Sequence, residues 1–86
     1  MERREVYKAI DSERDYQNKM IADDNRPDMI QDFHIGDTIS AIQHNLNKSL
    51  EIWYKGAEPH EEAMVYIRKI AALCVQAGEK NGMSNR

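Results

Sequence analysis

Cysteine, proline and glycine are all scarce in this chain. One cysteine, Cys74, excludes an internal disulfide, and two prolines and four glycines leave long stretches free to form regular structure. No apolar run approaches the roughly 20 residues of a membrane-spanning helix, and no charged-then-apolar leader opens the sequence. A lone thiol fits a reducing compartment, most simply a cytoplasm. We therefore expect one small cytoplasmic domain without covalent cross-links.

An excess of positive charge is also lacking. Charged residues make up 31% of the 86 residues, and the formal net charge is −3. Binding to nucleic acid draws most of its affinity from Lys and Arg on phosphates, so this balance argues against a nucleic-acid partner. The glycine patterns that cradle nucleotide phosphates, G-x-x-x-x-G-K-[ST] and the Rossmann fingerprint, are missing too. We expect no cofactor.

What the sequence does have is a helical period. Apolar residues recur at three- and four-residue steps over about residues 2–21, 35–55 and 59–81. Pro59 suits a first helical position, and Gly56 and Gly82 suit helix ends. The three segments predict three α-helices followed by a tail at 83–86.

A long loop is expected at 22–34, because ADDNRPDM is rich in Asp, Asn and Pro. Three apolar residues within it, Met29, Ile30 and Phe33, are expected to hold the loop against the helices. Connections of this length are often functional.

The second helix has one continuous apolar stripe, which is typical of the side that an amphipathic helix buries. The stripe consists of Ile35, Ile39, Ile42, Leu46, Leu50 and Trp53. The third helix is apolar over more than half of its circumference and needs cover on more than one side. A second copy of the chain supplies that cover more easily than two helices do.

The predicted fold is therefore an all-α three-helix bundle within a single domain, residues 1–86. A short turn favours an antiparallel hairpin of the second and third helices, with the first helix packed against it. We also predict a homo-oligomer, and the apolar residues off the main stripe of the second helix, Ala41, Ile52 and Tyr54, are candidates for its surface.

The first helix contains polar residues where apolar ones are expected. On a helical wheel with Val6 and Ile10, Glu13 and Gln17 fall on the apolar stripe and Arg14 falls on its edge. One interpretation is a buried polar network, in which Arg14 pairs with Glu13 or with a carboxylate on another helix and Gln17 caps a backbone group.

The other interpretation is a pocket for a ligand or partner, with the Arg14 guanidinium as a fork for an anion. Tyr7 and Tyr16 flank the stripe and are suited to stack on a base or fill a groove. Arg68 and Lys69 of the third helix are either solvated or line a groove with Arg14. The candidate binding residues are Tyr7, Glu13, Arg14, Tyr16, Gln17, Arg68 and Lys69.

Neither a metal site nor a catalytic thiol is predicted. No two of the three histidines, His34, His44 and His60, have the i,i+4 spacing of a helical metal pair. His34 is expected to order a helix start. Cys74 is placed on the inner side of the third helix, where cysteine acts as a small inert hydrophobe.

The segments EVYKAIDSERDYQ and IRKIAALCVQAGEKNGMSNR resemble a group of very small proteins encoded by bacteriophages and prophages. The shared outline is an ERxYQ segment in the first helix, an aliphatic middle helix and a last helix of the form RKIAAL. The resemblance covers nearly the whole chain and implies a phage origin and a host-cytoplasm setting.

A second, partial resemblance concerns the first helix. Its I-x-x-E-R-x-x-Q pattern, followed by a helical hairpin, is similar to the MazG-like nucleoside triphosphate pyrophosphohydrolases. Those enzymes hold magnesium with paired carboxylates on facing helices, and magnesium requires a tight octahedron of oxygen ligands. This chain departs from that pattern. Its second helix offers only Asp37 and Glu51, which are far apart, and its third offers Glu61, Glu62 and Glu79.

We therefore predict a non-enzymatic phage accessory protein that acts by binding. An anti-defence role fits best, by sequestering a nucleotide signal or by capping a host protein, with no membrane involved. The alternatives are a degenerate MazG-like hydrolase and a structural or assembly oligomer.

Overall fold

The computed structural model describes residues 1–24, 34–56 and 60–86, which form three α-helices without a strand. Helix α1 spans Arg3–Asp24, α2 spans Ile35–Lys55 and α3 spans His60–Asn81. The predicted all-α, three-helix class is confirmed. Within the described residues, no helix is both long enough and apolar enough to span a bilayer.

Helix α2 has the expected bounds, whereas α1 continues beyond the expected end at Ile21. The prediction of a loop from residue 22 was therefore wrong for residues 22–24. Each added helical residue gains a backbone hydrogen bond, so Asp residues near a helix end do not stop it. The remaining loop prediction, with its anchors Met29, Ile30 and Phe33, lies outside the described residues, as does Pro59.

His34 is the capping residue immediately before α2, and it orders the helix start as the sequence indicates. The His34 N–H donates to the Asp37 carboxylate at 3.0 Å, which satisfies one of the free backbone donors of the first turn. The Asp37 charge also lies at the positive end of the helix dipole. At the other end, Gly56 leaves the helix in an extended conformation, with φ −119° and ψ 155°.

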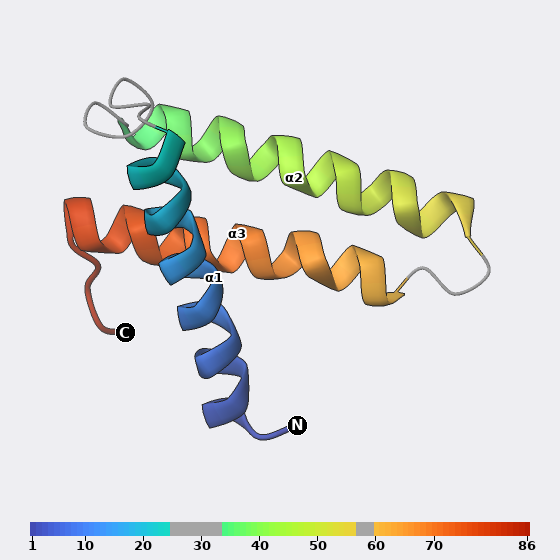
Figure 1. Cartoon of the computed structure of the whole chain (residues 1–86), viewed down its shortest axis with the longest axis horizontal. Helices are drawn as coiled ribbons and strands as arrows, with labels where there is room; N and C mark the ends of the chain where they lie inside the picture. The colour runs from blue at the N-terminus through green and yellow to red at the C-terminus, as the bar shows by residue number, and fades with distance from the viewer. Residues whose placement is uncertain (25–33, 57–59) are drawn as a thin grey trace.

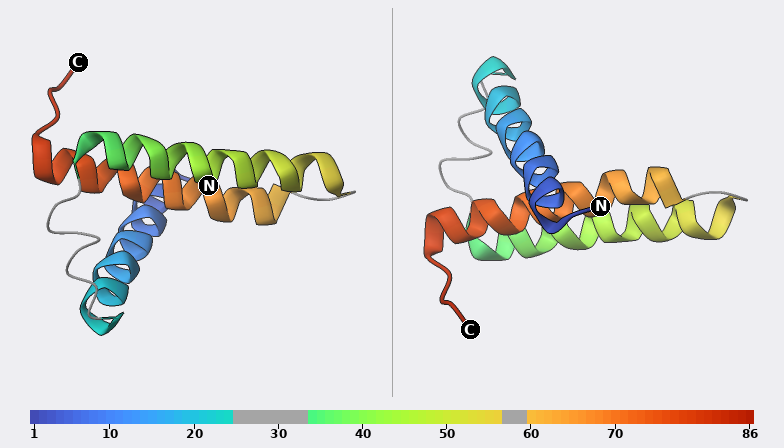
Figure 2. Two further views of the ribbon diagram at one scale, coloured as in Figure 1. Left: turned by 90° about the horizontal axis from the view of Figure 1, so that it is seen from above. Right: turned by 90° about the horizontal axis from the view of Figure 1, so that it is seen from below.

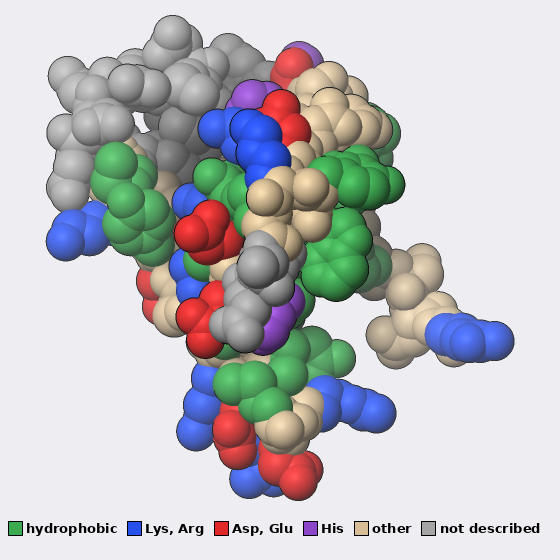
Figure 3. Space-filling model, turned by 90° about the vertical axis from the view of Figure 1, so that its right-hand side faces the viewer, with side chains coloured by type: hydrophobic (Ala, Val, Ile, Leu, Met, Phe, Trp, Pro, Cys, Tyr) green, Lys and Arg blue, Asp and Glu red, His purple; other side chains and the backbone are tan. Residues whose placement is uncertain are grey.

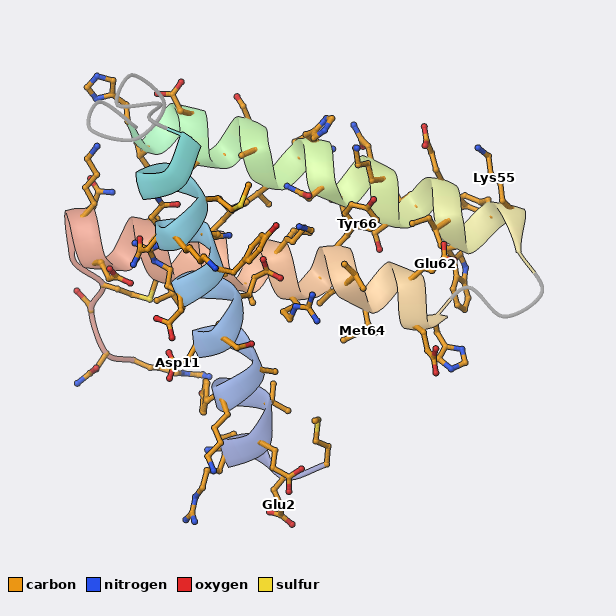
Figure 4. The ribbon with its side chains drawn as sticks, viewed as in Figure 1. Glu2, Asp11, Lys55, Glu62, Met64 and Tyr66 are labelled. Carbon is orange, nitrogen blue, oxygen red and sulfur yellow. The ribbon has the colours of Figure 1, made fainter. Side chains whose placement is uncertain are left out.

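Helices α2 and α3 lie side by side and antiparallel, as the predicted hairpin requires (Figure 1). Ser49 of α2 donates a hydrogen bond from its hydroxyl to the Ala63 carbonyl of α3 at 3.2 Å. The Lys48 ammonium lies 5.8 Å from the centre of the Tyr66 ring, a cation–π contact between the two helices. Figure 4 shows Tyr66 on the side of α3 that faces α2.

Helix α1 packs on α3, crosses it steeply and extends to one side of the hairpin only (Figure 2). Residues Ala9, Ile10 and Gln17 of α1 are half-buried, and Glu13 is buried. These positions recur at three- and four-residue steps, so they mark the face of α1 that meets α3.

The apolar stripe of α2 does not face α3. Instead, Thr38 and Ser49 are buried, and Ala41 and Ile52 are half-buried on the same face. At about 100° per residue, this face is rotated by roughly a quarter turn from the stripe. Ile39 of the stripe is consequently 61% exposed and Trp53 is 58% exposed.

This rotation corrects two expectations. The stripe was expected to be the buried side of α2, yet all of its residues except the half-buried Ile42 are exposed, and the buried residues of the helix are Thr38 and Ser49. Ala41 and Ile52, which were candidates for an oligomer surface, lie instead on the intramolecular face. Of the three candidates only Tyr54 is exposed.

The described residues contain almost no apolar core. Ala72 is their only buried hydrophobic residue, and none of their large side chains is fully buried. The accessible surface is 6970 Å², whereas about 5200 Å² is expected for a compact monomer of 10.0 kDa. The Cα radius of gyration is 13.9 Å, against about 12 Å expected for 86 residues. The chain on its own is open rather than globular.

Candidate functional site

The structure has two surface features that are candidate sites. One is a polar cavity where α1 crosses α3, and the other is an apolar groove between α2 and α3. The polar cavity is built around Glu13, whose side chain is only 4% exposed. The Arg68 guanidinium donates from Nε to Glu13 Oε1 at 2.7 Å. The Lys69 ammonium lies 4.0 Å from Glu13 Oε2, an ion pair longer than a hydrogen bond.

Arg14 forms a separate pair on the other side of this crossing. Its guanidinium makes a two-pronged contact with the Glu79 carboxylate of α3, Nε to Oε1 at 3.0 Å and a terminal nitrogen to Oε2 at 3.2 Å. A further N–H donates to the Asn18 side-chain oxygen. The expectation that Arg14 pairs with a carboxylate on another helix is thus correct.

Gln17 is half-buried beside these pairs. Its side-chain oxygen is buried and, alone among the buried side-chain polar atoms of the described residues, has no hydrogen-bond partner. The expected cap on a backbone group is not made by this oxygen, which can only accept hydrogen bonds.

The cavity has a volume of about 410 Å³ and is lined by Ser12, Glu13, Tyr16, Arg68 and Lys69. The structure therefore brings together four of the predicted binding residues, which are Glu13, Tyr16, Arg68 and Lys69. Arg14 and Tyr7 are not among the described residues that line it, and Tyr7 is exposed. Arg14 and Arg68 each pair with a carboxylate of their own, Glu79 and Glu13 respectively.

The apolar groove runs along the hairpin and has a volume of about 330 Å³. Its walls combine the exposed stripe of α2 with one face of α3. The described lining residues are Leu46, Ser49, Leu50, Trp53, His60, Ala63, Met64 and Ile67. Figure 3, which looks at the end where α2 leads into α3, shows hydrophobic side chains gathered beside the grey connection.

Sequence reasoning did not place this groove. The rotation of α2 that exposes the stripe depends on contacts with α3, and no pattern within α2 reports it. The signal that did exist was in α3, whose apolar residues cover more than half of its circumference and need cover on more than one side. His60, the first residue of α3, also lines the groove.

The remaining candidate residues are dispersed. His34 and His44 are exposed, and the described residues include no group of three or more His, Cys, Asp or Glu that could hold a metal ion. Cys74 is exposed, so its expected inner position was wrong. It lies on a face of α3 that neither α1 nor α2 covers.

No family model, curated protein or solved structure matches this chain.

Proposed function

We propose that the protein acts by binding another protein chain and performs no catalysis of its own. The observation that carries this proposal is the apolar groove between α2 and α3, whose large side chains lie exposed in the isolated chain. Large apolar patches of this kind mark protein–protein contacts in soluble proteins. Aromatic and aliphatic anchors such as Trp53 and Leu50 are the residues on which such contacts depend.

The charges at the α1–α3 crossing favour a protein partner over a nucleotide. A phosphate group is best held by an arginine whose donors are free. Here the Arg14 and Arg68 guanidiniums both donate to carboxylates of the same chain. A phosphate therefore competes with Glu13 for Arg68 and with Glu79 for Arg14, and the charge of the nearby carboxylate repels it.

The setting of the proposal comes from the resemblance to small phage-encoded proteins. In a host cytoplasm, a short helical protein with a ready apolar groove is suited to cap a host protein, such as a component of defence. This setting rests on the segments ERDYQ and RKIAAL in the sequence. The groove supports binding to a protein, and the resemblance suggests that this protein belongs to the host.

Native mass spectrometry of gently purified protein tests the proposal. We expect a mass that corresponds to the chain with a second polypeptide, whether another copy of 10.0 kDa or a host protein. Leu50→Asp should remove that polypeptide, because it places a charge in the groove, whereas Tyr54→Asp should keep it. A lone chain that carries no polypeptide in either form would contradict the proposal.

A second candidate function is sequestration of an anionic nucleotide in the α1–α3 cavity. It is favoured by the Lys69 ammonium, 4.0 Å from Glu13, and by the exposed ring of Tyr16 in the same cavity. A nucleotide present at about 100 times its Kd would stabilise the fold by about 2.7 kcal/mol and raise Tm by more than about 10 °C. We expect no such shift in a thermal melt. A shift that Lys69→Ala abolishes would favour this candidate instead.

A further inference from the structure

We infer that the occupant of the apolar groove is the same groove of a second copy of this chain. This inference rests on the proposed function and names its partner. The two hairpins would meet face to face around a two-fold axis, so that α2 and α3 of both copies form a four-helix core. Helix α1 of each copy would remain outside that core.

The surface area supports a permanent partner of this size. Seven large apolar side chains along the stripe and the groove are at least 39% exposed, namely Ile35, Ile39, Leu46, Leu50, Trp53, Met64 and Ile67. Covering them on each copy buries on the order of the 800 Å² per partner that a specific interface of standard size requires. A transient partner would leave this surface open for much of the time, whereas a second copy is present whenever the protein is made.

The chemistry of the groove suits an identical face. None of its described lining residues is Asp, Glu, Lys or Arg. In a two-fold interface every residue near the axis meets its own kind, so a charged face would repel itself. A neutral apolar face has no such repulsion. The same neutrality disfavours nucleic acid, which requires cations.

The shape of the exposed stripe also suits a second hairpin. Beyond the groove, Ile35 and Ile39 continue the stripe to the other end of α2, and both are exposed. A partner must therefore be about as long as α2 and be apolar along its length. An antiparallel copy meets both needs, because it brings its Trp53 end against the Ile35 end of the first copy. Helices pack in this way in four-helix bundles.

Helix α1 leaves this face free. The residues of α3 that pair with α1 are Arg68, Lys69 and Glu79. The centre of this set lies roughly a third of a turn around α3 from the centre of the α3 residues that line the groove, which are His60, Ala63, Met64 and Ile67. Figure 2 shows α1 extending from one side of the hairpin only. The side opposite α1 can therefore receive a second hairpin.

Sedimentation equilibrium of the wild-type protein and two variants tests the inference. We expect a wild-type mass of about 20 kDa, twice the 10.0 kDa of the chain. Leu50→Asp should raise the dimer dissociation constant at least about hundredfold, because a carboxylate in an apolar interface has no partner. Tyr54 was a candidate for the oligomer surface, but it is not among the described residues that line the groove. Under this inference Tyr54→Asp, which adds the same charge to the same helix, should leave the dimer intact.

Because Leu50→Asp can also impair folding, the wild-type protein is diluted in parallel and the emission of Trp53, the only tryptophan, is followed. Trp53 is 58% exposed in the single chain, so its emission should shift to longer wavelength as the dimer dissociates. A dimer that survives Leu50→Asp and is lost in Tyr54→Asp would overturn the inference, as would an emission that is independent of dilution.

A wild-type protein that stays a folded monomer at all concentrations would overturn the inference. Binding of an apolar fluorescent dye then shows whether the proposed function survives. If the monomer binds an apolar fluorescent dye and Leu50→Asp prevents this, the groove is open for a different protein and the proposed function survives. If no dye binds, the groove is not a binding surface, and both proposals fail.

Discussion

Glu13 is the only charged residue that is buried among the described residues. Its place on the apolar stripe of α1 is explained by Arg68, which reaches it from α3 and satisfies one carboxylate oxygen at 2.7 Å. A buried ion pair adds little net stability, since desolvation offsets the attraction. The Glu13–Arg68 pair instead fixes the position of α1 on α3, because the two side chains can meet at only one register of the two helices.

The cost of losing this pair should depend on which partner is removed. Arg68→Ala leaves a buried carboxylate with Lys69 alone and should lower the free energy of unfolding by about 1–3 kcal/mol. Glu13→Leu removes the buried charge, and its two cations are partly exposed and can turn to water. It should therefore change stability by less than about 1 kcal/mol in either direction. Urea unfolding at one fixed protein concentration measures both.

Arg14→Ala is the control for that comparison. Its partner Glu79 has a side chain 53% exposed, so the carboxylate left behind is already hydrated. We expect a loss of no more than about 1 kcal/mol, as for other surface ion pairs. If Arg68→Ala has no effect on the urea midpoint, Glu13 does not depend on Arg68 and the register argument is wrong.

At the scale of the element, the ends of the helices follow local rules. Gly82 closes α3 with φ +81°, and its N–H donates to the Gly78 carbonyl at 2.8 Å. This left-handed conformation is unfavourable for any residue with a Cβ. Gly36, in the first turn of α2, is in the opposite situation, because a Cβ added there meets no atom within 4 Å.

The two glycines should therefore respond to alanine with opposite signs. Gly82→Ala should lower the free energy of unfolding by about 1 kcal/mol through backbone strain. Gly36→Ala should raise it by about 0.4–1 kcal/mol, because alanine restricts the unfolded chain and fits the helix. Thermal melts followed by circular dichroism compare the two variants directly. A loss of stability in Gly36→Ala would mean that this turn of α2 is not helical.

At the scale of the whole molecule, the fold of the single chain has little apolar burial to stabilise it. With Ala72 as the only buried hydrophobic residue described, the isolated chain lacks the apolar burial that offsets conformational entropy. Stability should then come from association, and the midpoint of unfolding should depend on protein concentration.

We expect Tm to rise by about 4 °C for each tenfold increase in protein concentration, the value for a dimer of two 86-residue chains that unfolds in one step. Scanning calorimetry over a roughly hundredfold range of concentration measures it. Leu50→Asp should remove the dependence while Tyr54→Asp should retain it. A wild-type Tm that is constant over this range would show that the chain is stable without a partner.

Helix positions, most helix ends and the polar residues of α1 could be predicted from the sequence, because they depend on neighbours within one or two turns. The end of α1 at Asp24 was the exception. The spacing of Ile35 to Trp53 marks α2, and His34, Asp37 and Gly82 mark ends that the structure confirms. Glu13 was recognised as unusual for the same local reason. Its pairing with Arg68 was not predicted, because the sequence offered Arg14 as its partner and left Arg68 as either solvated or part of a groove.

Only the tertiary structure decided which face of each helix is covered. A stripe of apolar residues is compatible with any neighbour, so the sequence of α2 did not reveal that Thr38 and Ser49, rather than Leu50 and Trp53, turn toward α3. In the same way, the partner of Arg14 and the exposure of Cys74 depend on where other helices lie. The periodicity of residues within a segment determines that a helix forms. Packing between helices involves residues far apart in the chain, and it determines which faces of the helix stay exposed.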